Sequence, residues 1–212
     1  MYFQDREDAA IKLSKKLLKF RGHNLVVFAL PRGGVILGKT ISQRLKAPLD
    51  LIIPRKIPHP LNSEYAIGAI SESGKILLKQ EVKSTLDSAW LEQVVQAEMT
   101  ESRRRRELYL RGKKRIAAQN RICILVDDGM ATGMTMEAAI LDLAAENPKA
   151  IIAAVPIAPL ETVKKIQRLA NNVITVISPK TFLGSISAYY QNFPQLNDRE
   201  VINALNANAK FK

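Results

Sequence analysis

Two acidic residues, Asp127 and Asp128, stand directly after an apolar run over residues 122–126. Adjacent carboxylates repel each other, so such a pair needs a cation or hydroxyl donors to compensate its charge. Small and hydroxylated residues follow, so the backbone can turn tightly and expose N–H groups at the start of the next helix, where the helix dipole favours an anion. These residues are Gly129, Met130, Ala131, Thr132, Gly133 and Thr135. The loop therefore offers carboxylates at one end and a phosphate cradle at the other, which matches the vicinal hydroxyls and 5′-phosphate of a sugar phosphate.

Two further loops carry residues suited to phosphate. Pro31, Arg32, Gly33 and Gly34 follow the apolar run 25–30. Glycine lets a backbone approach a ligand and arginine can neutralise a pyrophosphate, although a plain turn would use the same residues.

The third loop is proline-rich and covers residues 54–62. It contains Arg55 and Lys56, which are either phosphate contacts or solvated loop charges. The single cysteine, Cys123, lies in an apolar run, where a buried and inert thiol is the expected state. The two histidines, His23 and His59, form no metal-ligand cluster with it.

The hydrophobic pattern predicts alternating strands and helices. Apolar runs of strand length predict buried strands at 25–30, 49–53, 121–126, 150–155 and 173–177. Amphipathic spacing predicts helices at 5–20, from 33 onward, and at 81–110, 133–146, 162–170 and 198–205. This alternation predicts an α/β fold with a doubly wound, mainly parallel sheet. Ligands bind such sheets beyond the carboxyl ends of the strands, so we expect the site in the loops after Leu30, Ile53, Val126 and Ile177.

We expect one domain over residues 1–212, with two additions. A hairpin at 65–70 and 75–79 and the long helix form an insertion over residues 65–120. Residues 178–212 form a small C-terminal hood. The run Arg103–Arg106 within the long helix is expected to be a solvated face, paired along the helix with glutamates such as Glu101.

The composition limits the classes of partner. The 212 residues carry 32 basic and 20 acidic side chains, for a net charge of +12. This charge predicts anionic ligands or binding partners. The basic residues are spread along the chain, which disfavours a dedicated nucleic-acid tail. No apolar run is long enough to span a bilayer, and the polar start is no secretory signal. We therefore expect a cytoplasmic protein without a membrane role.

The segment 124–135, an apolar strand followed by the acidic pair and Thr-Gly-Met-Thr, resembles the phosphoribosyl pyrophosphate motif of type I phosphoribosyltransferases. A metal or sugar-phosphate site of another α/β family is the alternative reading. The resemblance spans roughly residues 20–195, and the Arg55-Lys56 loop is similar to that of adenine-type members. It is strongest for a branch described as predicted phosphoribosyltransferases, which also carries a start like Phe3-Gln4-Asp5-Arg6.

The resemblance implies roles for these residues. Asp127 and Asp128 would hold the ribose hydroxyls, the residues up to Thr135 would wrap the 5′-phosphate, and Arg32 would stabilise the leaving pyrophosphate. Arg32, Gly33, Gly34, Arg55 and Lys56 would form the pyrophosphate site. Mg²⁺ would be bound through the substrate rather than by direct protein ligands.

The acceptor is less defined. Ala131 stands where hypoxanthine-guanine members carry an aspartate near the purine, and the glutamate of the adenine-type loop has only Glu64 nearby. Candidates for the acceptor pocket are Glu64, Tyr190 and Phe182, although packing of the tail on the core would also use these aromatic residues.

The expected activity is the transfer of phosphoribose from phosphoribosyl pyrophosphate to a nitrogen acceptor, such as a nucleobase, with release of pyrophosphate. Two alternatives remain: a regulator that senses phosphoribosyl pyrophosphate and binds nucleic acid, and a hydrolase or phosphorylase of ribose phosphates. The fold class also leads us to expect a homodimer.

Overall fold

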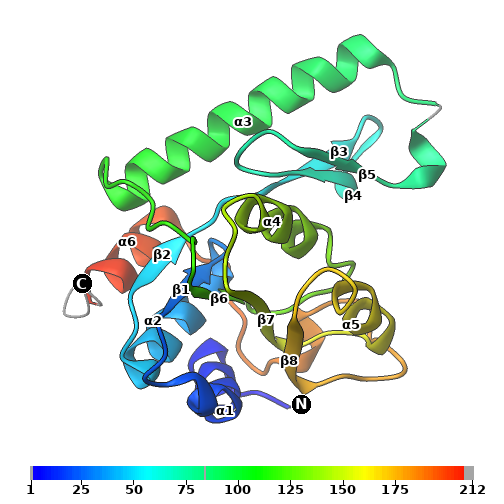
Figure 1. The fold of residues 1–212 in the computed structure, drawn as a ribbon. Helices are drawn as coiled ribbons and strands as arrows, with labels where there is room; N and C mark the ends of the chain where they lie inside the picture. Colours follow the sequence, from blue (N-terminus) through cyan, green and yellow to red (C-terminus); the bar gives the residue numbers. More distant parts are fainter. Residues whose placement is uncertain (1, 84, 208–212) are drawn as a thin grey trace.

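The computed structural model describes residues 2–83 and 85–207, without the side chains of residues 63 and 64. Its centre is a sheet of five strands in the order β2-β1-β6-β7-β8, and every neighbouring pair is parallel (Figure 1). The strands are β1 (Leu25–Ala29), β2 (Leu49–Leu51), β6 (Ile122–Val126), β7 (Ala150–Ile157) and β8 (Asn172–Ile177). This confirms the predicted α/β fold with a parallel sheet.

Helices cover both faces of this sheet because successive strand residues point to opposite sides. In β1, Val26 and Phe28 join one buried cluster, while Leu25 and Val27 join the other. The first face is covered by α4 (Met134–Ala144) and α5 (Leu160–Ile166), and the second by α1 (Arg6–Leu17) and α2 (Gly33–Leu45). A short 3-10 turn, Leu18–Phe20, extends α1.

The chain leaves β1 toward β2 on one side and later returns to β6 on the other side of β1. This reversal is the topological switch point, where open parallel sheets bind ligands. Ala29 and Val126 are register partners at the carboxyl ends of the two strands, so the loops that follow β1 and β6 start side by side.

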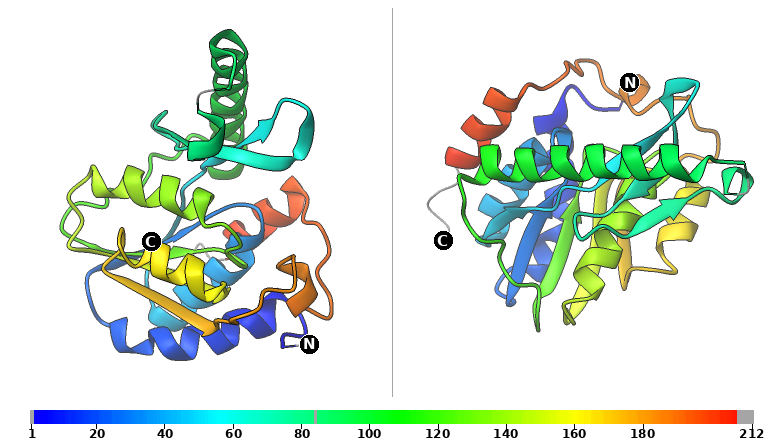
Figure 2. Two further views of the ribbon diagram at one scale, coloured as in Figure 1. Left: turned by 90° about the vertical axis from the view of Figure 1, so that its right-hand side faces the viewer. Right: turned by 90° about the horizontal axis from the view of Figure 1, so that it is seen from above.

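A second, three-stranded sheet and a long helix form a separate layer, here named the cap unit (residues 55–110). It contains β3 (Arg55–His59), β4 (Asn62–Ile70), β5 (Ile76–Leu78), the 3-10 turn Gln80–Val82 and α3 (Ser88–Leu110). Viewed from above, α3 crosses the top of the molecule (Figure 2). Helix α4 contacts both layers, with Met134 and Ala138 packed against Ala69.

The cap unit corrects two expectations about secondary structure. Residues 55–59 are a strand and not part of a loop, so the small sheet begins before the expected hairpin. Pro58 fits there because β3 is an edge strand, whose outer side needs no N–H donor. The long helix begins at Ser88 rather than at residue 81, since Asp87 caps it by accepting from the Trp90 N–H.

The cap unit is tied to the core by ionic and polar contacts. The buried Asp142 on α4 accepts from the N–H of Glu72, at 2.7 Å, and from Ser73. Glu72 in turn pairs with Arg106, which also donates to the Leu51 carbonyl at 2.8 Å. The expectation of a solvated Arg103–Arg106 face is therefore wrong for Arg106, which points inward because the Glu72 carboxylate lies beneath α3.

The C-terminal tail, residues 178–207, runs back across the carboxyl edge of the sheet. It contains the 3-10 turn Ser187–Tyr189 and ends in α6 (Asp198–Asn206), which packs against α2 and α3. Tyr190 is bridged to Phe3, so the middle of the tail meets the N-terminal residues there. Within the described residues, no helix combines the length and the apolar character needed to cross a bilayer.

Candidate active site at the switch point

The loops after β1, β2 and β6 converge with the cap unit around one cavity of about 490 Å³. The acidic pair and the predicted pyrophosphate residues other than Gly34 line it, from loops far apart in the sequence, whereas Thr135 alone of the predicted 5′-phosphate residues does so among those the structure describes. The lining consists of Leu30, Pro31, Arg32, Gly33, Pro54, Arg55, Lys56, Pro58, Ala66, Glu98, Asp127, Asp128 and Thr135. A cavity of this size lies within the range for small-molecule ligands.

Glycine is required where the first loop meets the acidic pair. A β-carbon at Gly33 would lie 1.8 Å from the Asp128 Oδ2 atom, and one at Gly34 would lie 2.5 Å from the Val126 carbonyl oxygen. Only glycine allows this approach. The backbone of the first loop therefore packs against the Asp128 carboxylate. This contact fixes the position of the acidic pair beside the start of α2.

The charge of the acidic pair is only partly compensated by the protein. Burial and the charge of Asp128 raise the pKa of Asp127 well above its usual range, while Lys56 partly offsets this effect. Burial also raises the pKa of Asp128, although Arg6 works against it. A site that holds two poorly solvated carboxylates is arranged to receive hydroxyl donors or a cation.

Arg6 is a site residue to which the sequence analysis gave no role. Its Nε donates to Asp128 Oδ2 at 2.8 Å, and another guanidinium nitrogen donates to the Pro194 carbonyl at 2.8 Å. The guanidinium also lies over the Phe193 ring, 3.7 Å from its centre. The sequence does contain an indication of this role. Arg6 lies on the same helix face as the apolar residues Ala10 and Leu13, and a charge on a buried face needs a partner.

The loop after the acidic pair is shaped as a cradle. Met130 N–H is bonded to the Ile157 carbonyl at 2.9 Å, which anchors the loop to β7. Gly133 adopts φ +76°, a conformation that favours glycine, and α4 begins at the next residue. Across the described part of the chain, the N–H groups of Ala131, Thr132 and Gly133 have no protein acceptor, so they are available to an anion.

Arg32 is turned toward the C-terminal tail. It donates to the Leu196 carbonyl at 2.9 Å and lies 3.3 Å from the Asp198 carboxylate, which also accepts from Tyr109 and Arg104. The Pro31–Arg32 peptide bond is cis. Arg32 lines the cavity, yet its charge is already shared with the first turn of α6.

The basic residues of β3 face the same cavity. Arg55 pairs with Glu98 of α3 at 2.7 Å, which fixes its side chain within the cap unit. Lys56 is exposed and lies close enough to affect Asp127. Of the two, Lys56 is the freer cation for a ligand phosphate.

The acceptor-pocket candidates are placed differently. Tyr190 is buried and donates its hydroxyl to the Asp128 carbonyl at 2.6 Å, and Phe182 stacks on Tyr189. The described lining of the cavity contains neither residue. Tyr190 therefore supports the loop that contains Asp128, and Phe182 packs within the tail. Glu64 lies in β4, and its side chain is outside the described residues.

Cys123 lies inside β6, and burial raises the pKa of its thiol to about 12. It is therefore a thiol and not a thiolate nucleophile at neutral pH.

A doubly wound parallel sheet with an acidic pair and a phosphate cradle at its switch point is the arrangement of the type I phosphoribosyltransferases. Residues 2–191 match the family model described as a phosphoribosyl transferase domain, so the chain belongs to this family. The resemblance noted in the sequence is thus confirmed.

Similar proteins agree with this assignment. The chain is 38% identical over 202 residues to proteins from two strains of Mycobacterium tuberculosis that are named as candidate phosphoribosyl transferases, covering 94% of this chain and 45% of theirs. It thus spans about half the length of these curated relatives. A crystal structure of TT1426 from Thermus thermophilus matches with a TM-score of 0.80 and 34% identity, covering 98% of this chain and 99% of that chain.

Proposed function

We propose that this protein transfers the phosphoribosyl group from phosphoribosyl pyrophosphate to a nitrogen acceptor and releases pyrophosphate. The observation that carries the proposal is the convergence of the acidic pair, the Gly33-Gly34 turn and the basic strand β3 on one cavity at the switch point. In this proposal the carboxylates would bind the ribose, and the loops on either side of them in the cavity would bind the phosphates.

The donor would be held by the residues of three loops. Asp127 and Asp128 would accept hydrogen bonds from the ribose hydroxyls, and the free N–H groups of residues 131–133 would bind the 5′-phosphate. Lys56 and Arg32 would face the pyrophosphate. The ribose hydroxyls would add donors to those that the carboxylates already have, which are Arg6 for Asp128 and the Asp128 N–H for Asp127.

A magnesium ion fits this donor set. Magnesium prefers oxygen ligands and is commonly held by one or two carboxylates together with substrate phosphates. When bound with the pyrophosphate, it would supply positive charge to the leaving group. The ion would be held through the substrate rather than by direct protein ligands.

The chemistry would be an inverting displacement at ribose C1. The bond from C1 to the pyrophosphate oxygen breaks with its electron pair on oxygen, while the acceptor nitrogen attacks from the opposite face. The protein would contribute mainly positioning and charge stabilisation, through Asp127, Asp128 and the phosphate loops. No side-chain nucleophile is needed.

The direct test is a pyrophosphate-release screen with phosphoribosyl pyrophosphate, Mg²⁺ and a panel of nucleobases and amines. Release that needs both an acceptor and Mg²⁺, and that Asp127→Asn abolishes, supports the proposal. Release without any acceptor would instead indicate hydrolysis. Tight donor binding without turnover on any acceptor would indicate the sensing role, in which nucleic-acid binding with a steep salt dependence is expected.

A further inference from the structure

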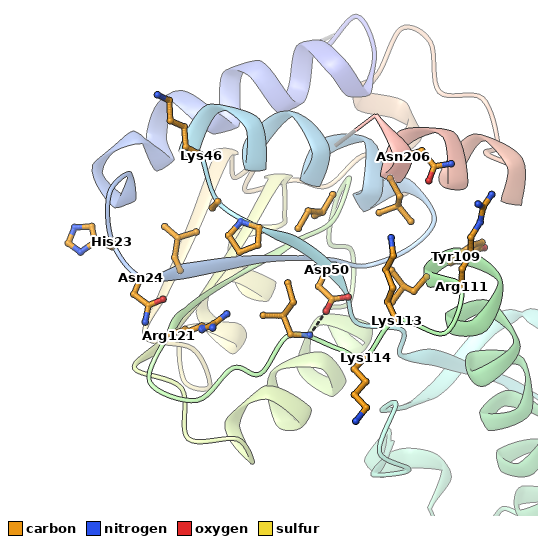
Figure 3. Close-up of a pocket in the computed structure, with 17 residues that line it drawn as sticks. His23, Asn24, Lys46, Asp50, Tyr109, Arg111, Lys113, Lys114, Arg121 and Asn206 are labelled. Carbon is orange, nitrogen blue, oxygen red and sulfur yellow. Dashed lines mark hydrogen bonds between the residues drawn. The ribbon is translucent and has the colours of Figure 1, made fainter. Parts of the chain in front are cut away.

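A second and larger cavity, of about 710 Å³, opens at the opposite edge of the central sheet (Figure 3). It lies where the parallel strands begin, near Leu25, Leu49 and Arg121, and where helices α2, α3 and α6 end. The residues of the proposed donor site line the other edge and do not contribute to it.

The rim of this cavity is strongly basic. Figure 3 shows the cationic side chains placed around the opening: Lys46, Arg111, Lys113, Lys114 and Arg121. Among the residues that the structure describes, none of these five forms an ion pair with a carboxylate. Five unpaired cations around one opening repel each other, and an anion that binds between them would reduce this repulsion.

The one acidic residue of the lining does not neutralise this rim. Asp50 is only 3% exposed, and its two oxygens accept from the N–H groups of Leu51, at 2.7 Å, and Ile116, at 2.5 Å. Burial raises its pKa, so its negative charge is disfavoured. Its carboxylate anchors the backbone rather than the lysine and arginine side chains.

The need to stabilise helix ends explains only part of the positive charge on the rim of this cavity. Lys46 and Arg111 follow the last turns of α2 and α3, where a cation offsets the negative end of the helix dipole. Each helix end carries roughly half a negative charge, so three ends offset well under half of five cations. Lys113, Lys114 and Arg121 lie in irregular segments, where helix stabilisation gives no reason for them.

The floor of the cavity is apolar. It is formed by Leu25, Ala47, Pro48, Leu49, Leu110, Ile116 and Leu205. Inorganic phosphate would leave this surface uncovered, and a wholly apolar ligand would leave the rim charges unpaired. A ligand with a flat apolar body and several negative charges satisfies both parts.

We propose that this cavity is a second binding site, for a nucleoside diphosphate or triphosphate whose base packs on the apolar floor and whose phosphates contact Lys113, Lys114 and Arg121. The volume is within the range of small-molecule pockets, and the concave shape favours a single nucleotide over an extended nucleic-acid strand. The inference does not depend on the activity at the switch point.

Titration calorimetry with ATP and GTP tests the proposal, with adenosine and inorganic pyrophosphate as partial ligands. We expect nucleotide binding that survives the double variant Asp127→Asn/Asp128→Asn and weakens about 10-fold or more in Lys113→Ser/Lys114→Ser, since each contact to phosphate is charge-assisted. The matched control Lys83→Ser/Lys164→Ser removes the same charge elsewhere and should bind as the original protein does. Thermal scans confirm that each variant is folded.

Adenosine and pyrophosphate should each bind at least about 10-fold more weakly than ATP, since each lacks half of the recognised chemistry. Three results would overturn the proposal: no nucleotide binding up to millimolar concentration, equal affinity in the Lys113/Lys114 variant, or loss of binding in the Asp127/Asp128 variant alone. Binding of RNA without binding of ATP or GTP would equally overturn it.

Discussion

Asp127 and Asp128 lie at the end of a buried strand, where a charge is poorly solvated. The raised pKa of Asp127 means that the folded protein holds this proton more tightly than the unfolded chain does. A carboxyl group of this kind stabilises the fold at low pH, and that contribution is lost as the pH rises through the raised pKa. The unliganded site therefore costs stability at neutral pH, as expected of groups arranged for binding.

Asp127→Asn should accordingly raise the melting temperature at pH 7 without ligand, by about 2–4 °C for each kcal/mol recovered in a domain of this size. The gain should shrink as the pH falls toward the ordinary range of aspartic acid. Thermal scans between pH 4 and pH 7 measure this. A lower melting temperature for the variant at pH 7 would show that the protein already compensates the negative charge of Asp127.

Arg6 is expected to stabilise Asp128. Arg6→Met keeps the bulk of the side chain but leaves the carboxylate without its cation, which typically costs about 3–5 kcal/mol for a buried pair. The side chains of Arg6 and Asp128 are 10% and 16% exposed, so the lower end applies. Denaturant unfolding measures the loss.

The control for Arg6 is the double variant Arg6→Met/Asp128→Asn, which removes both charges. It should recover a substantial part of the stability lost in Arg6→Met, because the stranded carboxylate is gone. Strictly additive effects of the two substitutions would show that the ion pair itself contributes nothing.

The first turn of α6 holds Arg32 away from the centre of the cavity through Asp198. Because this pair is partly exposed, freeing Arg32 should gain only about 0.2–1 kcal/mol. Asp198→Asn is therefore expected to tighten pyrophosphate binding by up to about fivefold in a calorimetric titration. Arg104→Gln removes another partner of Asp198 but leaves Arg32 engaged, so it should not tighten binding.

The turn between β4 and β5 is attached to α4 through Asp142. Asp142→Ala leaves the N–H groups of Glu72 and Ser73 without their acceptor, which should cost about 1–3 kcal/mol. Hydrogen exchange should then accelerate in residues 71–75 while β6 remains protected. Equal acceleration in β6 would mean that the cap unit and core open together.

The elements of the core could be read from the sequence because each has one dominant signal. Apolar runs such as 122–126 become strands buried on both faces, and the predicted bounds differ from the observed ones by a few residues. The strand at Arg55–His59 was missed because Pro58 normally argues against a strand, and only its edge position makes it acceptable.

The donor loops were predicted because their residues are contiguous and their chemistry is local. The contact of Arg6 was not predicted, since a charge on its apolar stripe indicates a buried partner but does not identify Asp128, which is 122 positions away. Tyr190 was predicted as an acceptor-pocket candidate, but its hydrogen bond to the Asp128 carbonyl arises from tertiary packing that the sequence does not indicate. The second cavity is also a product of tertiary structure, because three helix ends and three strand starts build it.

Two groups of the basic residues that give the net charge of +12 line cavities, where they can act on ligands. Arg32, Arg55 and Lys56 face the switch-point cavity, and a second group of cations surrounds the opposite edge of the sheet. Spread in this way, the charge suits small anionic ligands at two edges better than one continuous nucleic-acid surface.

The central claim is that the segment from Asp127 to Thr135 binds phosphoribosyl pyrophosphate. Calorimetric titration of the Mg²⁺ complex of phosphoribosyl pyrophosphate into the original protein and into Asp127→Asn/Asp128→Asn tests it. The account predicts one site in the original protein and a loss of at least about 100-fold in the variant, since two charged hydrogen-bond acceptors are removed. Equal affinity in a folded variant would contradict it.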